Sequence, residues 1–180
     1  MIIEPVLPFL ACEFRVKFAT APWERRRAAA LRRDVFCREQ SIFQDDDRDA
    51  IDDVAIPLVA LSSLAIAHED VVGTVRIHEA EPGLWWGSRL AVSRPYRRIG
   101  AIGTGLIRLA VGSAHAMGCQ RFLAHVQSQN AALFHALHWD TLEEISVHGH
   151  PHHFMQADLS YYPPVTAPET GFLSHLKQAA

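Results

Sequence analysis

The stretch "SRLAVSRPYRRIGAIGTGLIRLAVGSAHAMGCQRFLAHVQ", residues 88–127, reads as a strand, a loop, a helix and a second strand. Residues 88–93 and 121–127 are short runs with the composition of strands. Between them, leucine, isoleucine and alanine recur at helical spacing over 103–117, and Gly118 suits the position just after a helix C-terminus. Two strands joined by a crossover helix form a βαβ unit, so we expect these strands to pair in parallel.

The flanking segments predict a mixed, mostly antiparallel sheet around this parallel pair. Upstream we expect a strand, a helix capped by Thr20, and two strands joined by the turn "HED": 13–19, 20–40, 56–67 and 71–80. "PGLWWG" is expected to turn the chain into strand 88–93. Downstream we expect a short helix and a last antiparallel pair: 130–139, 143–149 and 154–162. The sequence thus predicts one α+β domain over residues 1–180, with a core at about 13–162 and a peripheral extension at 163–180.

Composition excludes several classes of protein. Hydrophobic residues make up 49% of the 180 residues, which favours a folded core over disorder. The net charge of −3 gives no reason to expect a nucleic-acid or membrane partner. The apolar N-terminus lacks the basic region of a signal peptide, so we expect a cytoplasmic protein. Cys12, Cys37 and Cys119 share no close spacing and are expected to be reduced, mostly buried thiols.

The loop before helix 103–117 has features of an anion site. A helix N-terminus offers free backbone N–H groups and the positive end of the helix dipole. Small residues at 100, 101 and 103 let a ligand approach the backbone, and Arg97 and Arg98 add positive charge. The spacing matches neither a Walker loop nor a Rossmann fingerprint. The alternative is a helix start that packs tightly against the sheet, with both arginines in solvent.

The same residues resemble the pyrophosphate motif of the GNAT acyltransferases, Arg/Gln-x-x-Gly/Ala-x-Gly/Ala, which Arg98, Ala101 and Gly103 fit. Over about residues 13–162, further segments resemble a group of GNAT proteins associated with nitrogen starvation and with nitrilase gene clusters: "VFCREQSIF", "VVGTVRIHE", "WWGSRLAV", "LAHVQ", "LHW" and "PHHFM". The resemblance implies a GNAT-like fold, in which helices flank a mixed sheet with a central parallel pair. It also implies acyl-CoA, most simply acetyl-CoA, as co-substrate, and a role in nitrogen metabolism.

The resemblance assigns a donor site around these residues. The backbone of Leu90, Ala91 and Val92 would pair with pantetheine, and the N–H of Val92 would polarise the thioester carbonyl. Asn130 would either reach the pantetheine arm or cap the following helix. The remaining cofactor-binding residues would hold the pyrophosphate: Arg97, Arg98, Ile99, Gly100, Ala101, Ile102, Gly103 and Thr104.

Catalysis needs a base, because an alkyl ammonium with a pKa near 10 must lose a proton before it attacks. We favour Glu79, in a strand end that also holds His78 and Glu81; the alternative is that Glu79 faces solvent. Many relatives protonate the departing thiolate with a tyrosine, but the aligned residue here is Phe134. Either another donor acts, His135 or Tyr161, or the thiolate leaves unassisted.

Three further features leave alternatives open. The acidic loop "DDDRDAIDD", 45–53, could clasp a cationic substrate or calcium, or lie in solvent; Asp47 and Asp52 match acidic positions of the related group. The histidine-rich run 148–153 could bind adventitious metal through His148, His150 and His152, but no metal centre is predicted from it. Of Trp85 and Trp86, alternation puts one in the core and the other beside the acceptor pocket.

The leading hypothesis is an acyl-CoA-dependent N-acyltransferase that acts on the amine of a small molecule. Homodimers are frequent in the resembled family. The first alternative is an autoinducer-synthase-like acyltransferase; the intact Arg98–Gly103 loop argues against it, because we expect that group to need no coenzyme A cradle. The second alternative is a non-catalytic sensor that binds acyl-CoA.

Overall fold

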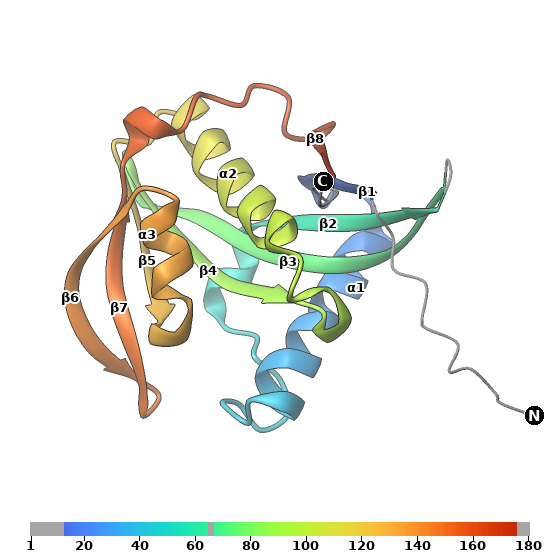
Figure 1. The fold of residues 1–180 in the computed structure, drawn as a ribbon, viewed down its shortest axis with the longest axis horizontal. Helices are drawn as coiled ribbons and strands as arrows, with labels where there is room; N and C mark the ends of the chain where they lie inside the picture. Colours follow the sequence, from blue (N-terminus) through green and yellow to red (C-terminus); the bar gives the residue numbers. More distant parts are fainter. Residues whose placement is uncertain (1–12, 65–66, 176–180) are drawn as a thin grey trace, which may run out of the picture.

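The computed structural model describes residues 13–64 and 67–175, which form an eight-stranded sheet and three α-helices (Figure 1). The strands are β1 Glu13–Phe18, β2 Ile56–Leu64, β3 Ala67–Glu81, β4 Leu84–Val92, β5 Arg121–Gln127, β6 Trp139–Val147, β7 His150–Ala157 and β8 Phe172–His175. The helices are α1 Pro22–Arg33, which continues as a π-helical segment Asp34–Glu39, α2 Gly100–Ala116 and α3 Ala131–Ala136. None of the helices in the described ranges is long and apolar enough to cross a membrane.

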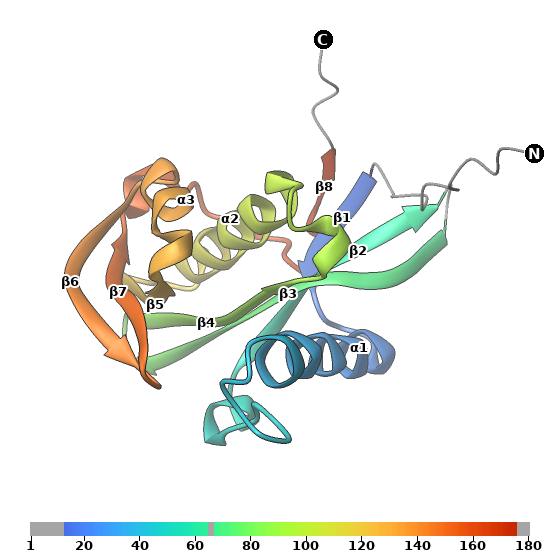
Figure 2. The ribbon, with the colours of Figure 1, turned by 60° about the horizontal axis from the view of Figure 1, so that its bottom comes forward.

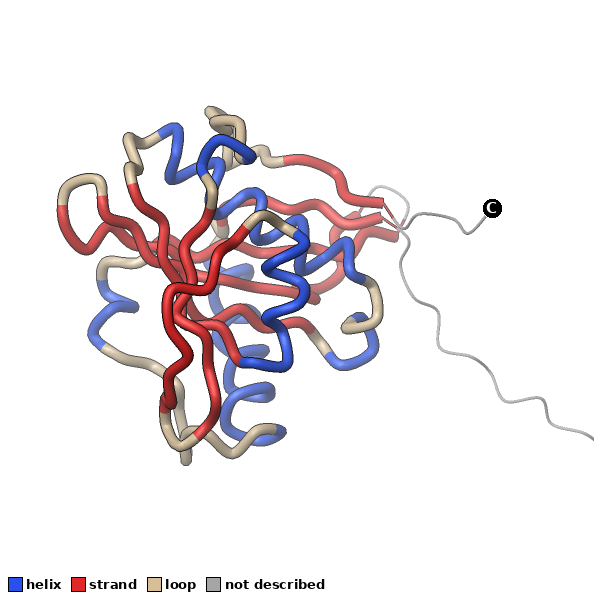
Figure 3. The backbone as a smooth tube through the Cα atoms, turned by 60° about the vertical axis from the view of Figure 1, so that its left-hand side comes forward, coloured by secondary structure: helices blue, strands red, loops and turns tan. Residues whose placement is uncertain are grey.

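The strand order is β6-β7-β5-β4-β3-β2-β1-β8, and only β4 and β5 run parallel among the pairs described. Figure 2 shows α1 on one face of this sheet, with α2 and α3 on the other. Figure 3 shows the strands as one twisted layer between the helices. The mixed, mostly antiparallel α+β fold predicted from the sequence is therefore confirmed, including the parallel pair around a crossover helix.

Helix α2 packs close to the sheet and to the segment after Tyr162 because it carries glycine on its buried side. A Cβ at Gly105 would lie 3.1 Å from Val16 of β1, and one at Gly112 would lie 2.8 Å from Val165. The helix ends as predicted: Met117 is the C-cap, and Gly118 follows with φ of 90°. Gly105 and Gly112 thus serve packing, which leaves the glycines at the start of the helix to be explained separately.

Helix α1 starts at Pro22 without help from Thr20. The predicted Thr20 cap is wrong, because Ala21 is the N-cap residue and Glu24 supplies the capping oxygen. Glu24 Oε2 accepts hydrogen bonds from the backbone N–H groups of Thr20 and Ala21, and the Lys17 ammonium lies 2.8 Å from Oε1 of the same carboxylate. Burial would raise the pKa of Glu24, but these hydrogen bonds lower it. The ion pair therefore fixes the turn from β1 into α1.

Several element boundaries differ from the prediction. Residues 68–70 belong to β3 rather than to a turn, and the connection at 65–66 lies outside the described residues. Only Pro82 and Gly83 form the turn before β4. The tail is not merely a peripheral extension, because Phe172–His175 adds strand β8 beside β1. Cys37 and Cys119 are free and buried as predicted, whereas Cys12 lies outside the described residues.

The parallel pairing lies earlier in β4 than predicted. Leu84–Gly87 pair with Arg121–Ala124, while the predicted segment from residue 88 onward has no pairing with β5. The cause is a bulge, because β4 advances from Ser88 to Ala91 while β3 advances only from Arg76 to Thr74. Within the bulge Arg89 has φ of 57°, a conformation rare for a residue with a side chain. Beyond the bulge, β4 and β5 separate and leave a gap in the sheet.

Candidate active site

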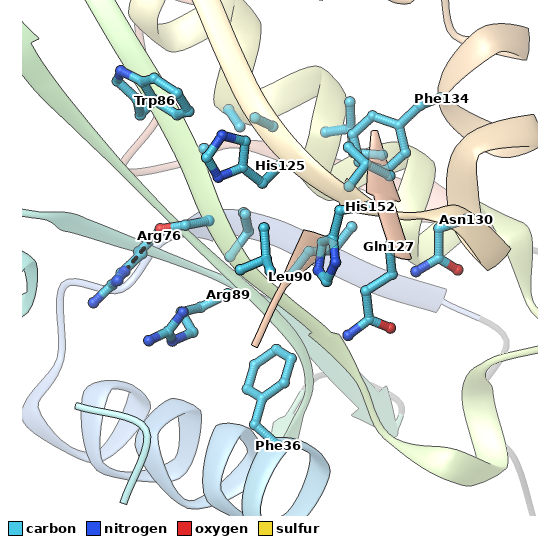
Figure 4. A pocket seen from close by; sticks show the side chains of 18 of the residues that line it. Phe36, Arg76, Trp86, Arg89, Leu90, His125, Gln127, Asn130, Phe134 and His152 are labelled. Atoms are coloured by element: carbon cyan, nitrogen blue, oxygen red, sulfur yellow. Dashed lines mark hydrogen bonds between the residues drawn. The ribbon is translucent and has the colours of Figure 1, made fainter. Parts of the chain in front are cut away.

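A cavity of about 510 Å³ occupies the place where β4 and β5 separate. Its walls come from both faces of the sheet: Phe36 follows α1, whereas Phe134 lies on α3 at the opposite face (Figure 4). Leu90 of β4 and Gln127 of β5 lie between them. The cavity therefore passes through the sheet rather than lying on one side of it.

The free edge of β4 borders this cavity. Ser93 N donates to Val72 O of β3 at 2.8 Å, so the polar groups of alternate residues face β3 and those between face the gap. This alternation turns the N–H groups of Leu90 and Val92 toward the gap, as the donor-site prediction requires. It turns the backbone of Ala91 toward β3, away from the gap in which the prediction places pantetheine.

The start of α2 is open. Ile99 is the N-cap but makes no side-chain cap, and the first turn holds no acidic residue. A Cβ at Gly100 would meet nothing within 4 Å. Arg98 is exposed and has no hydrogen-bond or ion-pair partner within the described residues. These features suit an anionic group at the helix N-terminus.

Fewer backbone N–H groups are free there than the prediction requires. Ile99 N donates to Tyr96 O, and Ile102 N donates to Ile99 O while its side chain is fully buried. Gly103 and Thr104 already lie inside the helix, where N–H groups bond to the preceding turn. The backbone donors with no partner in the described chain are therefore the N–H groups of Arg98, Gly100 and Ala101.

Arg97 is not available as predicted. Its Nε donates to Val92 O at 3.0 Å, and its Nη2 lies 2.6 Å from Glu39 Oε2. Because Glu39 ends the π-helical segment after α1, Arg97 ties the donor loop to the opposite face of the sheet. Arg98 thus remains the free guanidinium of the two.

Asn130 lies at the N-cap position of α3, but its side chain makes no capping hydrogen bond. It lines the cavity instead. Of the two alternatives drawn from the sequence, side-chain capping is therefore not realised, and the amide is free to meet a ligand in the gap.

The favoured base, Glu79, and the acid candidates His135 and Tyr161 lie away from the cavity, whereas His78, at the same strand end as Glu79, lines it. Glu79 is exposed, and its Oε1 accepts a hydrogen bond from Gly83 N at 2.8 Å, so it holds the β3–β4 turn. His135 bonds to Trp139 O and Thr141 Oγ1, and Tyr161 stacks on His138 at 3.8 Å between ring centroids. None of these candidates is among the residues that line the cavity. Glu79 has a structural role that the sequence does not reveal.

Four other histidines line the cavity: His78, His125, His148 and His152. Burial and then the charge of Arg76 lower the pKa of His78; burial and then His152 lower the pKa of His125. His125 directly follows Ala124, the last residue of β5 that pairs with β4. Its ring lies 5.1 Å from that of Trp86. Strand alternation in "RFLAHVQ" could have placed His125 and Gln127 on this face.

The acidic loop is neutralised by the chain's own arginines. Asp47 is 2% exposed and lies 2.7 Å from Arg32 and 3.0 Å from Arg89. Asp49 and Asp52 each lie 2.7 Å from the Arg76 guanidinium. These three carboxylates are therefore paired with arginines of the chain rather than simply solvated, and no group of acidic residues in the described ranges is arranged to hold calcium. Asp49 remains partly exposed and lines the cavity.

This cluster also holds the bulge in β4. The Arg89 side chain pairs with Asp47 and Asp49, and its guanidinium lies 4.6 Å from the centre of the Phe43 ring. A non-glycine residue with positive φ costs about 1 kcal/mol or more, so it needs such partners. The acidic loop thus helps to keep β4 apart from β5.

The structure also places the histidine-rich run and the two tryptophans, for which the sequence leaves alternatives open. His152 is buried with Nδ1 2.9 Å from His150 O, while His148 packs its ring on Phe43. In the described ranges no group of three or more His, Cys, Asp or Glu side chains is arranged to hold a metal ion. As predicted, Trp85 is buried in the core and Trp86 lines the cavity.

Structural comparisons agree with this geometry. A protein of Lactobacillus plantarum described as an N-acetyltransferase superposes with a TM-score of 0.70 at 22% identity, over 81% of this chain and 98% of that one. An acyl-CoA N-acyltransferase of Pseudomonas aeruginosa gives 0.64 at 18% identity, over 81% and 99%. The acyl-homoserine lactone synthase BjaI gives 0.60 at 20% identity, over 76% and 75%. At these identities the likeness shows the fold.

BjaI also corrects one argument from the sequence. It is described as CoA-dependent, with S-adenosylmethionine and isopentyl-CoA bound, so a coenzyme A cradle does not distinguish an N-acetyltransferase from an autoinducer synthase. A comparison with curated protein sequences gives no match. The family model of the acetyltransferase (GNAT) family matches residues 18–139, more than half of the chain. The chain therefore belongs to the GNAT family of acetyltransferases.

Proposed function

We propose that this chain transfers an acyl group from a coenzyme A thioester to the amine of a small molecule by direct attack. One observation carries the proposal: β4 separates from β5 at the cavity, and the loop that continues from β4 leads directly into the uncapped N-terminus of α2. Pantetheine and pyrophosphate are two parts of one ligand that need those two features side by side. The thioester supplies the activated acyl group.

The donor side follows from these features. The N–H groups of Gly100 and Ala101 and the Arg98 guanidinium would hold the diphosphate. The free N–H groups of Leu90 and Val92 would bind the pantetheine arm, with Val92 next to the thioester carbonyl, whose developing charge a fixed donor stabilises. Asn130, free of any capping role, would reach the same arm from α3.

We assign the role of base to His125 rather than Glu79. His125 lies where the gap opens, and its lowered pKa keeps the imidazole neutral at pH 7, ready to accept a proton from the ammonium. Phe134 cannot donate a proton to the thiolate. With no acid at that position, the thiolate would leave unassisted or take a proton from water.

The test combines binding with turnover. Calorimetry with coenzyme A is expected to show binding, and thiol release from acyl-CoA is then followed over a panel of amines that includes amino acids and S-adenosylmethionine. Turnover with an ordinary amine supports the proposal, turnover only with S-adenosylmethionine supports the autoinducer-synthase alternative, and binding without turnover supports the sensor. Absence of coenzyme A binding would exclude the proposal and the sensor, and would leave an autoinducer-synthase-like enzyme that uses another thioester.

The base is tested by His125→Gln against His150→Gln, at an exposed position that does not line the cavity. General-base catalysis contributes about 10²- to 10⁴-fold, so His125→Gln is expected to lower kcat by about that factor and to abolish the acidic limb of the pH profile. His150→Gln is expected to keep both. Equal losses in the two variants would contradict the assignment.

We further propose that the chain acts in nitrogen metabolism, as the resemblance to the nitrogen-starvation group implies. Gene order offers a direct check. A neighbouring nitrilase gene would support the proposal, and a consistently different neighbourhood would oppose it.

A further inference from the structure

The cavity has an apolar branch on the α2 side of the sheet. Ala110 and Val111 of α2, Phe122 of β5 and Phe134 of α3 line it, and Trp139 lies beside them. The Phe134 and Phe122 rings each meet Trp139 edge-on, at 5.0 and 5.7 Å between centroids. The only polar side-chain atom of these five, Trp139 Nε1, donates to Tyr162 OH. The branch therefore offers its occupant no hydrogen bond from these side chains.

This branch lies deeper than the donor loop. Val111 follows Gly103 by eight positions of one helix, which places it about 12 Å further along the α2 axis. That direction leads toward the closed end of the gap, where Gly87 pairs with Ala124. A ligand anchored at the start of α2 and along the free edge of β4 would thus point its far end into the branch.

The other side of the cavity differs in chemistry. Arg76, Asp49, His78 and His125 line it on the α1 face. A polar amine suits that side, whereas the apolar branch suits a hydrocarbon. An acetyl group would fill only the entrance and leave the deeper aromatic walls without contact.

We propose that the apolar branch is an acyl-chain pocket, and that the preferred donor carries an aliphatic or aryl acyl group longer than acetyl. This inference rests on the proposed function, because it takes the thioester to lie at the free edge of β4. Ala110 has the smallest of the lining side chains named above, so a larger side chain at this position would fill part of the branch.

The first experiment titrates the full chain with coenzyme A and with its acetyl, butyryl, hexanoyl and octanoyl thioesters. Burial of one methylene contributes about a fourfold gain in affinity, so the dissociation constant is expected to fall about fourfold per methylene until the branch is full. Equal affinity across the series, or tightest binding of acetyl-CoA, would overturn the pocket while the proposed function stood. If no ligand bound, coenzyme A included, both the acyl-chain pocket and the proposed function would be contradicted.

The second experiment uses Ala110→Leu, which fills the branch, with Ala116→Leu as the matched control. Ala116 is the exposed last residue of the same helix and does not line the cavity. Ala110→Leu is expected to abolish the gain from hexanoyl-CoA while coenzyme A binds as in the wild type; Ala116→Leu is expected to keep the whole series. An unchanged series in a folded Ala110→Leu variant would contradict the pocket. If Ala110→Leu does not fold, the titration of the wild-type chain still tests the pocket by itself.

Discussion

Two charged loops flank the gap in the sheet, and they use their charges in opposite ways. In the acidic loop, residues 45–53, Asp47, Asp49 and Asp52 are all paired with arginines of the same chain. In the donor loop, residues 97–104, Arg98 has no partner within the described part of the chain, and the first turn of α2 is uncapped. One loop is closed on itself and the other is open to a ligand.

The difference shows what a charged segment means in a sequence. Both loops are conspicuous in charge, and both suggest ligand binding. The partners of the acidic loop are Arg32, Arg76 and Arg89, which lie in α1, β3 and β4. No pattern in the sequence around the loop predicts these pairs. A charge is free for a ligand only if the fold has not already paired it, because a buried ion without a partner costs several kcal/mol.

The largest effect is expected in the acidic loop. Asp47→Asn removes the carboxylate shared by Arg32 and Arg89 and leaves both guanidinium groups partly unpaired. Breaking a buried ion pair costs about 3–5 kcal/mol, so the free energy of unfolding in urea is expected to fall by about that amount. Asp45→Asn, at an exposed position of the same loop, is expected to change it by less than about 0.5 kcal/mol. Equal effects would mean that burial does not distinguish these carboxylates.

A smaller effect, on binding alone, is expected in the donor loop. Arg98→Glu replaces a free cation with an anion at the proposed diphosphate site. A charge-assisted hydrogen bond contributes about 1.5–3 kcal/mol, so the dissociation constant for coenzyme A is expected to rise about 10- to 100-fold with unchanged thermal stability. Arg94→Glu, exposed in the preceding turn, serves as the control. If Arg98→Glu lowered thermal stability and left coenzyme A affinity unchanged, the donor loop would be structural rather than open to a ligand.

Acid should act on the first loop and spare the second. Hydrogen bonds from Arg76 lower the pKa of Asp49; at Asp52 burial opposes ionisation, but hydrogen bonds from Arg32 and the backbone still lower the pKa. Because these pKa values are lower in the folded state, the carboxylates stabilise the fold above the unfolded pKa of about 3.9, and this stability is lost as the pH falls further. Urea unfolding from pH 7 to 3 measures it. A curve that stays flat below pH 4 would refute the role of the cluster.

The smallest effect concerns Gly100. A Cβ there meets nothing within 4 Å, so Gly100→Ala is expected to stabilise the chain by about 0.5 kcal/mol, through loss of entropy in the unfolded state. Coenzyme A affinity is expected to fall severalfold, because the methyl group occupies space that the ligand needs. Unchanged affinity would show that Gly100 serves the helix start rather than a ligand.

Prediction from the sequence succeeds where neighbouring residues suffice. The order of strands and helices, the parallel pair, the end of α2 at Gly118 and the division of labour between Trp85 and Trp86 follow from periodicity and alternation. The failures share a cause. Residue type suggests roles for Glu79, Arg97 and Thr20, but hydrogen bonds decide what they do. Glu79 accepts from Gly83 N, Arg97 donates to Val92 O, and Glu24 rather than Thr20 caps α1.

The sequence by itself determined the α+β architecture and the place of the donor loop, because hydrophobic periodicity and glycine spacing act over a few residues. Tertiary structure alone decided where β4 leaves β5, which backbone amides stay free, and that the cavity runs through the sheet to an apolar end. The physical reason is that these features depend on contacts between distant segments. Arg89 keeps its bulge through Asp47 and Asp49, which lie about 40 positions earlier in the chain.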